Sequence, residues 1–569
     1  MATFSIPSRN NEIRQIGRSD YGEIVESFNL DLNRKFGKVF TSKKLLKVLD
    51  ATDNLSNSDA NAFAFYAGDY YASTDDDLYT CAGTVDPTVT ANWTEETDIT
   101  TTLTNDTDLV VFADLLLMSA GSAIFSWDGT TFSNSWSTGK ISSLTNATQM
   151  HVHRGGAETL FVLDENTVRY WNADAGASTV TLQTDLTASC VNSGVNAIWV
   201  GTKSTSDQNA YVYEIYIGET DPVSANPIAR NAYKVDGTAV MAIEVIDNVP
   251  YIVTEKGSIQ AFNGAGFSTV ASFPFANTTE VINTNSIHPN GIKLHGDSLY
   301  INIATEIRES NEDYAKNTPS GIWEYNRITG QLTHRFAFAE DDTENGAIHL
   351  NNFIGGAVYI MDNTYGLLLA SAENGKSSAS SGIYADTGSG YGYLITGEIN
   401  SDSVQDFYES VYLKAKTLAS GESIELKYRK TKIDREFADC TASDTNVLNT
   451  TDTQTNVAVG WEVTDIHTGK IAHITKITST STVTVYTLDR DIATTGDALR
   501  VEFNNFFPVG YDDREGTYDG TIQQYLTADG ELKEHGGFGT NPWIQFKLVM
   551  DGDIELRQFL AKSNNKNGV

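Results

Sequence analysis

Residues 123–132 read AIFSWDGTTF, an apolar run that ends in an aromatic and an acidic residue before a short turn. The same order of residue types returns in TVRYWNADAG (167–176), SIQAFNGAGF (258–267) and GIWEYNRITG (321–330). A short apolar run bounded by Gly, Asn and Asp is typical of a β-strand that ends in a tight turn. The chain therefore repeats one strand-and-turn unit, and this repeat predicts the fold.

The residue that closes each unit recurs at a nearly constant spacing. Successive steps are 48, 44, 45, 46, 63 and 44 residues, and the polar stretch 308–320 accounts for the long step as an enlarged hairpin loop. Units of about 40–50 residues predict the four-stranded blades of a β-propeller. The closing residues are Tyr79, Trp127, Trp171, Tyr216, Phe262, Tyr325 and Leu369.

Each closing strand is preceded by a strand with a bulky residue, and an alternating strand lies upstream of that one. In the last unit these two strands are AVYIMD (357–362) and AIHLNN (347–352). Such a unit cannot bury its faces alone, and radial stacking of several units solves this problem. We predict six to seven blades over residues 37–370, with GKVFTSKKLLKVL (37–49) as the strand that closes the ring with the last blade.

The pattern changes after the propeller. Residues 371–392 are rich in Gly, Ser and Ala, which predicts a linker. Strands in 393–438 and 499–569 predict a β-sandwich, and the short strands and tight turns of 439–498 predict a small inserted β-barrel. Residues 1–36 are expected to form an N-terminal arm that packs on this C-terminal region. The predicted fold class is therefore all-β: a propeller followed by a sandwich with an inserted barrel.

The chain has 569 residues and a net charge of −35, which excludes a protein that grips nucleic acid through phosphate contacts. Residues 51–139 carry 14 acidic side chains and no Lys or Arg. No stretch approaches the ~20 apolar residues of a membrane span, and the first residues lack a secretory signal. Cys81, Cys190 and Cys440 are far apart and odd in number, so we expect reduced thiols in a protein made in a cytoplasm.

The sequence contains no motif that points to catalysis. His151 and His153 alternate on one strand and have the spacing of an edge-on metal pair, but no carboxylate cluster lies near them in sequence. The acidic groups at 75–77 and 512–519 lack the regular spacing of a calcium loop. SWDGTTF (126–132) resembles the Asp-box turn of sialidases without its closing Trp. We therefore predict no enzyme, and no catalytic, cofactor-binding or metal-binding residue.

Four stretches carry a resemblance to a known group of proteins: residues 25–45, 296–338, 460–492 and 543–559. In texture and domain order they resemble the tail nozzle or tubular tail proteins of short-tailed bacteriophages. The resemblance implies a non-enzymatic virion protein, made in the cytoplasm of a bacterial host, that forms a cyclic homo-oligomer, expected to be a hexamer. It also implies neighbours in the tail, namely adaptor or portal proteins and fibres, and an acidic channel that conducts and retains DNA without binding it specifically.

Two other functions stay open at this point. A receptor- or glycan-binding propeller would use exposed aromatic residues in the long inserts, such as Tyr314. A propeller hydrolase or lyase would need acidic or basic side chains that converge at the ring axis. The basic clusters 34–47 and 426–435 are expected either to solubilise strand edges or to contact acidic surfaces, including other copies of this chain.

Overall fold

The computed structural model is all-β and divides into two compact units. The sheet-and-barrel unit comprises Met1–Leu45, Thr333–Asn351 and Gly388–Val569, and the propeller unit comprises Leu46–Leu332 and Asn352–Thr387. Its one helical element among the described residues is a short 3-10 turn, η1 (Thr90–Asn92). The structure describes residues 3–6, 24–34, 38–48, 60–74, 77–99, 103, 107–141, 143–155, 158–174, 176–206, 209–216, 229–273, 287–303, 320–338, 353–361, 365–374, 382–397, 399–400, 407–431, 436–452, 456–465, 470–508, 533–536 and 543–564.

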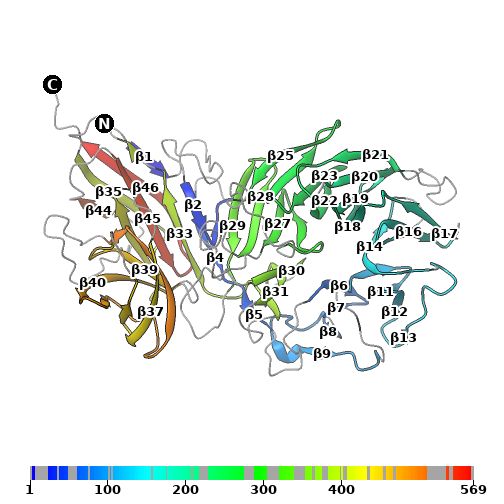
Figure 1. The fold of residues 1–569 in the computed structure, drawn as a ribbon, viewed down its shortest axis with the longest axis horizontal. Coiled ribbons are helices and arrows are strands. Elements are labelled where there is room, and N and C mark those ends of the chain that lie inside the picture. Colours follow the sequence, from blue (N-terminus) through cyan, green and yellow to red (C-terminus); the bar gives the residue numbers. More distant parts are fainter. Residues whose placement is uncertain are drawn as a thin grey trace. The chain divides into compact units, whose positions relative to one another are not determined.

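Seven four-stranded antiparallel sheets surround a common centre, which confirms the predicted propeller at the upper blade number (Figure 1). Six of the blades use four consecutive strands each. They are β6 (Ala62–Tyr66), β7 (Asp69–Ser73), β8 (Leu78–Ala82) and β9 (Trp93–Glu95); β10 (Leu109–Phe112), β11 (Leu115–Ala120), β12 (Ala123–Trp127) and β13 (Phe132–Ser133); β14 (Ala147–His153), β15 (Thr159–Asp164), β16 (Thr167–Asn172) and β17 (Gly176–Thr181); β18 (Leu186–Ser193), β19 (Ala197–Ser204), β20 (Tyr211–Tyr216) and β21 (Ala229–Lys234); β22 (Val240–Ile246), β23 (Val249–Thr254), β24 (Ser258–Phe262) and β25 (Phe267–Ser272); and β26 (Ile292–His295), β27 (Ser298–Ile303), β28 (Gly321–Asn326) and β29 (Gln331–Phe336).

The seventh blade joins the two ends of the propeller segment. It consists of β30 (Phe353–Ile360), β31 (Leu368–Asn374), β32 (Gly382–Ala385) and β5 (Leu46–Lys47). The short strand β5 pairs with β32, with Lys47 opposite Tyr384 and Leu46 opposite Ala385. The ring is therefore closed by a strand from the N-terminal side, within the 37–49 stretch that the sequence suggested. Only two residues of that stretch belong to the blade.

The propeller ends later than the sequence predicted. AVYIMD lies mainly in the first strand of its blade and Leu369 in the second, one strand earlier than expected, and 347–352 lies outside the described residues. The expected linker 371–392 consequently contains β32. Its small residues serve close packing, because a side chain at Gly356 would meet the buried Ser371 at 2.8 Å. The predicted linker is therefore wrong at its two described ends, which belong to the seventh blade and to β33, while residues 375–381 lie outside the described residues.

The recurring Asn or Asp caps the turn between the third and fourth strand of a blade. Asp128 Oδ1 accepts hydrogen bonds from the backbone N–H groups of Thr130 (2.9 Å) and Thr131 (2.7 Å). Asn263 and Asn326 make the same two bonds in their blades, at 3.1 and 3.0 Å. Such side-chain turns fix the backbone without a glycine at every position. This is the physical origin of the polar part of the repeat.

The recurring aromatic residue packs on the preceding blade. Trp171 meets Phe112 and Trp136 of the preceding repeat edge to face, with ring centroids 5.7 and 5.6 Å apart. Phe262 also packs on Trp199 of the preceding blade, at 5.1 Å with the two rings tilted at 53°. Aromatic rings bury large areas and gain from edge-to-face geometry, so these contacts hold neighbouring blades together. The repeat thus encodes both the turn and the interface between blades.

The sheet-and-barrel unit contains one twelve-stranded sheet in place of two separate sheets. Its two halves, on either side of β4, curl around a shared apolar core, as in a sandwich. Phe546 of one half and Phe559 of the other pack at 5.6 Å within this core. The strands are β1 (Thr3–Ile6), β2 (Ile24–Phe28), β3 (Leu30–Asp31), β4 (Val39–Lys43), β33 (Gly390–Thr396), β34 (Ile399–Asn400), β35 (Phe407–Ala415), β36 (Ser423–Arg429), β43 (Phe507–Pro508), β44 (Lys533–Gly536), β45 (Trp543–Asp551) and β46 (Glu555–Asn564).

Both ends of the chain contribute to this sheet. The N-terminal strand β1 pairs with the last strand β46, and β2 pairs with β33, in the region where the N-terminal arm was expected to pack. The whole propeller segment leaves after β4 and returns at β33, and these two strands pair directly: Lys43 lies opposite Gly390 and Ser42 opposite Tyr391. The propeller is therefore an insertion between two neighbouring strands of the sheet.

A closed six-stranded barrel is inserted in the same unit, slightly wider in sequence than the predicted 439–498. Its core holds Trp461, Tyr486 and Cys440, and burial raises the pKa of the Cys440 thiol to about 12. All three cysteines of the chain are free and buried. The strands, in barrel order, are β37 (Glu436–Asp444), β38 (Val447–Thr450), β41 (Thr484–Leu488), β40 (Ile471–Ser479), β39 (Glu462–Asp465) and β42 (Ala498–Asn504).

A buried ion network connects the barrel to the sheet. The Glu462 carboxylate on β39 accepts hydrogen bonds from the ammonium groups of Lys427 (2.6 Å) on β36 and Lys547 (2.8 Å) on β45. All three side chains are at most 5% exposed. Burial alone would raise the pKa of Glu462, but the two ammonium groups hold it far below its ordinary range. The pairing specifies how the barrel docks on the sheet.

Candidate functional site at the propeller axis

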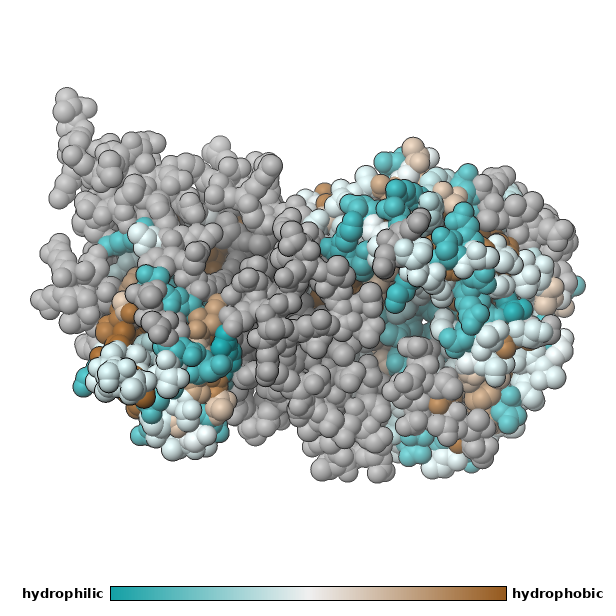
Figure 2. All heavy atoms as spheres, viewed as in Figure 1, coloured by the Kyte–Doolittle hydropathy of each residue, from teal (hydrophilic) through white to brown (hydrophobic). Residues whose placement is uncertain are grey.

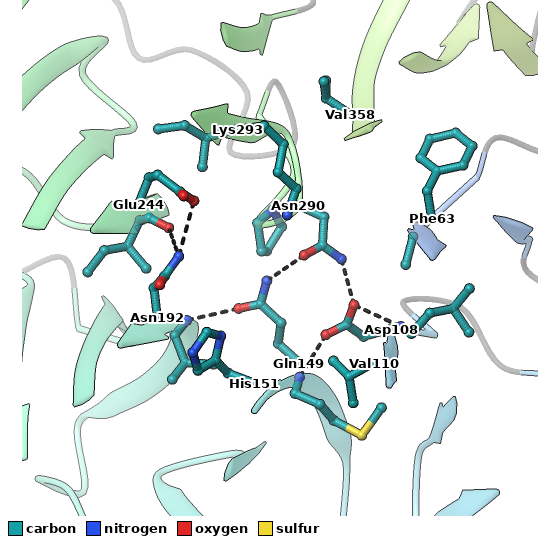
Figure 3. Close-up of a pocket in the computed structure, with 17 residues that line it drawn as sticks. Phe63, Asp108, Val110, Gln149, His151, Asn192, Glu244, Asn290, Lys293 and Val358 are labelled. Carbon is teal, nitrogen blue, oxygen red and sulfur yellow. Dashed lines mark hydrogen bonds between the residues drawn. The ribbon is translucent and has the colours of Figure 1, made fainter. Parts of the chain in front are cut away.

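The first strand of every blade lines the propeller axis, where a cavity of about 120 Å³ lies. The inner strands are β6, β10, β14, β18, β22, β26 and β30. Each of them contributes one side chain to a ring around the cavity (Figure 3). In blade order the ring consists of Phe63, Val110, His151, Asn192, Glu244, Lys293 and Val358.

The ring has two chemically distinct arcs. Val358, Phe63 and Val110 come from three successive blades and form an apolar arc, on one side of the cavity in Figure 3. The other four blades supply a polar arc of His151, Asn192, Glu244 and Lys293. Little apolar surface is exposed inside the cavity, so the polar arc supplies most of the groups that a guest molecule could contact.

A second set of polar side chains connects the blades beneath the ring. Asp108 accepts hydrogen bonds from Asn290 Nδ2 (2.8 Å) and from the backbone N–H groups of Leu109 (2.9 Å) and Met150 (2.7 Å). Burial raises the pKa of Asp108 to about 6, against the effect of these donors. Gln149 donates to Asn290 Oδ1 (3.1 Å), as Figure 3 shows. These groups satisfy one another and serve as structural ties across the axis.

The polar arc keeps unused hydrogen-bonding capacity. Asn192 Nδ2 donates to Glu244 Oε2 at 3.1 Å, and His151 Nε2 lies 2.7 Å from Ser193 Oγ. Within the part of the chain that the structure describes, Lys293 Nζ has neither a hydrogen-bond nor an ion-pair partner. Its ammonium points into the ring in Figure 3. A cation with three donors is therefore available to a guest molecule.

Enclosure by protein sets the protonation of this arc. Burial raises the pKa of Glu244 to about 7, with Lys293 and the bond from Asn192 acting in the opposite direction. Burial lowers the pKa of His151 to about 3, and the positive charge of Lys293 adds to that effect. His151 is therefore neutral at pH 7, whereas Glu244 exchanges its proton close to that pH.

The structure places only one of the residues singled out in the sequence at this site. His151 lines the cavity and His153 is buried two residues further along β14. Among the described residues no group of three or more His, Cys, Asp or Glu could hold a metal ion. Residues 75–76 and 512–519, which the calcium hypothesis concerned, lie outside the described residues.

The sequence argument missed Glu244 and Lys293. The signal that would have found them is present in the repeat itself. MHVHRG, MAIEVI and GIKLHG carry His151, Glu244 and Lys293 at corresponding positions of the first strands. Superposition of these strands would have placed one side chain per blade at the axis. Glu244 and Lys293 would then have been recognised as charged residues at positions where three other blades carry apolar residues.

No protein-family model matches the chain, and a search of curated proteins finds no match either. Solved structures with a similar shape include the computationally designed protein Ika8, with a TM-score of 0.35, 12% identity, and coverage of 60% of this chain and 99% of that one. The Pan2 WD40 domain of Neurospora crassa matches with a TM-score of 0.38 and 9% identity. The match covers 60% of this chain and 95% of that domain.

An extracellular domain of a putative hybrid two-component system from B. thetaiotaomicron, BT3049, gives a TM-score of 0.41 and 11% identity. It covers 75% of this chain, and the chain spans about half (51%) of that domain. Likenesses at this level carry no argument about function, and the fold assignment rests on the strand pairing itself. Among the described residues no helix is long and apolar enough to cross a membrane.

Proposed function

We propose that this chain is a non-enzymatic structural subunit of a bacteriophage tail that assembles with copies of itself into a ring, expected to be a hexamer. The ring surrounds an acidic channel that conducts and retains DNA. The subunit is made in the cytoplasm of the bacterial host and ends in the virion, next to adaptor or portal proteins and fibres. The four resembling stretches and the domain order support this assignment.

The observation that carries the proposal is the filled axis of the propeller. A cavity of about 120 Å³ that is crossed by the Asp108–Asn290–Gln149 ties has no room for a DNA duplex. A DNA channel therefore has to form between several copies of the chain. A cyclic assembly supplies such a channel when its head-to-tail contacts close into a ring.

The charge supports the same proposal. The chain carries −35, and the segment 51–139, which includes the first two blades, contributes 14 acidic residues and no basic side chain. Acidic walls repel the phosphate backbone, so DNA in such a channel stays mobile. On the propeller face in view, Figure 2 shows hydrophilic side chains over much of the described surface.

Electron microscopy of the purified full-length chain, and of virions that contain it, tests the proposal. We expect a six-fold or twelve-fold ring around a central pore. A monomer in solution together with single copies on a spike of the virion would overturn it. Mass photometry across a range of protein concentrations gives an independent count of the subunits.

A receptor- or glycan-binding propeller is the second candidate. Exposed apolar side chains at hairpin tips favour it: Ile328 is 71% exposed and Val195 is 59% exposed. Tyr314, which the sequence offered for this role, lies outside the described residues. Binding of the isolated chain to a glycan array, without ring formation, would favour this candidate over the tail ring.

A hydrolase or lyase is the third candidate. An axis lined only by apolar and Thr side chains would have spoken against it, but Glu244, Lys293 and His151 meet there. A carboxyl group with a pKa raised to about 7 by burial is a feature of many active sites. An assay for products released from polysaccharides tests this candidate. Product release by the unaltered chain that is lost in Glu244→Gln would favour the enzyme over the structural proposal.

A further inference from the structure

The axial cavity holds opposite charges that do not neutralise each other directly. Lys293 and Glu244 come from neighbouring blades, at the same level of the ring. They influence each other electrostatically, yet no ion pair joins them within the part of the chain that the structure describes. Both side chains therefore face the cavity, where Asn192 donates a hydrogen bond to Glu244 and Lys293 has no partner among the described residues.

The charges of the polar arc restrict the class of guest. A simple anion would be attracted to Lys293 but would lie close to the Glu244 carboxylate. A simple cation would have the opposite conflict, since it would leave the Lys293 ammonium facing it. A small molecule that carries both charges satisfies both side chains at once, because buried charges require partners.

The apolar arc and the volume restrict the guest further. Val358, Phe63 and Val110 close the cavity opposite the charged pair but expose little apolar surface to it, so a large apolar group finds few contacts there. A cavity of about 120 Å³ is close to the ~150 Å³ that accommodates a six-carbon ring in an engineered protein core. The guest is therefore limited to roughly six to eight non-hydrogen atoms by this comparison.

We propose that the axial cavity is a binding site for a small zwitterion, which is the chemistry of a small free α-amino acid. Its carboxylate binds the Lys293 ammonium, its ammonium group binds the Glu244 carboxylate, and its small size fits the volume of the cavity. The site belongs to one propeller and does not depend on the assembly of a ring.

The Asp108–Asn290–Gln149 ties make the site selective for this arrangement. Asp108 already accepts three hydrogen bonds, and the Asn290 and Gln149 side chains bond each other. These groups do not compete for the ligand. His151 is neutral at pH 7 because burial lowers its pKa to about 3, so it adds no charge to the arc.

Three probes that share one branched carbon skeleton test the proposal on the full-length chain. L-Valine carries both charges, isovalerate lacks the ammonium group and isobutylamine lacks the carboxylate. Isothermal titration calorimetry and ligand-observed NMR should detect L-valine and find each single-charge analogue at least about tenfold weaker, since loss of one charged hydrogen bond has roughly that effect. No binding of L-valine at millimolar concentration, or equal binding of all three probes, would overturn the proposal.

Two variants and two matched controls locate the site. Lys293→Met and Glu244→Gln should each weaken L-valine binding by about tenfold or more. Lys256→Met and Glu165→Gln change exposed residues of the same propeller and should leave binding within about twofold. Equal affinity in all four variants would place the ligand elsewhere. Circular dichroism and melting temperature establish folding, and the probe comparison on the unaltered chain stands without any variant.

Discussion

The side chains on each inner strand separate into two roles. Leu109, Met150, Val191, Ile243 and Ile292 are buried within the blades and all are apolar. The next residue along each strand faces the axis, where hydrophobic packing imposes no single residue type. Alternation along a strand explains this division, because successive side chains point to opposite faces. The axis positions are therefore the ones at which the propeller can vary its chemistry.

Replacement of Glu244 by Gln should change how stability depends on pH. Its pKa is raised to about 7 in the folded chain, above the ordinary value of 4.5, so the folded state binds more protons between these pH values. Stability contributed by the protonated carboxyl is therefore present at pH 4.5 and is lost as the pH rises through 7. Relative to the unaltered chain, Glu244→Gln should gain about 1–2 kcal/mol between pH 5 and pH 8.

Chemical denaturation of both proteins at the two pH values measures this difference. Asp108 also has a raised pKa, but it is present in both proteins and its effect cancels in the comparison. Parallel pH profiles of the two proteins would contradict the protonation assigned to Glu244.

At the scale of the element, the side chains that cap the turns between the third and fourth strands act over the shortest distance in sequence. Each bonds backbone groups two and three residues ahead. Asn263 is the clearest case, because its side-chain oxygen accepts two backbone hydrogen bonds at 3.1 Å in an exposed turn. Asn263→Ala should lower the free energy of unfolding by about 1 kcal/mol, through loss of these bonds. Thermal unfolding followed by circular dichroism measures the change.

Asn263→Asp is the matched control, since it keeps an acceptor oxygen in the same position. It should retain most of the stability that Asn263→Ala loses. Equal loss in both variants would show that the turn depends on the amide nitrogen or on backbone preference instead of the cap.

The elements that the sequence predicted well are those whose signal is local. The aromatic residue, the Asx cap and the turn occur within ten residues, so the third strands of most blades could be recognised directly. The last blade could not, because its closing strand β5 has two residues and its partner β32 lies more than 330 positions away. Strand pairing between such distant segments leaves no local pattern. The stretch 37–49 was predicted as one strand, whereas the structure has two strands there, β4 in the large sheet and β5 in the seventh blade. Both pair with segments far away in the sequence.

At the scale of the whole molecule, the candidate site was out of reach of local patterns. Its seven ring residues extend from Phe63 to Val358, one from each blade. None of them forms a motif with its neighbours in sequence, and each looks like an ordinary strand residue. Packing of two neighbouring blades brings Glu244 and Lys293 together, and closure of the ring places Val358, Phe63 and Val110 opposite them. Knowledge of the blade register is therefore necessary before the site can be recognised.

The docking of the barrel on the sheet gives a prediction at this scale. Glu462→Gln would leave the Lys427 and Lys547 ammonium groups buried without a carboxylate between them. We expect a loss of about 3–5 kcal/mol in the stability of the sheet-and-barrel unit, which is the range for a broken buried ion pair. Chemical denaturation, followed by hydrogen–deuterium exchange of the barrel strands around Trp461, measures it.

Asp439→Asn is the control within the same barrel. Asp439 pairs with Arg500 at 2.8 Å, but its side chain is 77% exposed, so the expected cost is at most about 1 kcal/mol. Similar losses in the two variants would mean that burial does not set the value of these pairs. Because the pKa of Glu462 lies far below its ordinary range, its contribution should persist at pH 5 and disappear only in strong acid.

The pairing of Lys43 with Gly390 places the two ends of the propeller insertion directly opposite each other. The coding sequence between them could therefore be exchanged during evolution. Directly opposed residues of an antiparallel pair can be joined by a two-residue hairpin, so the register of these two strands does not require the propeller between them. The seven-bladed ring is therefore a domain inserted at a position that a short hairpin turn could otherwise occupy. Recombination could exchange it for another domain with equally close termini while the host sheet keeps its register, and the propeller could change its specificity without altering the rest of the chain.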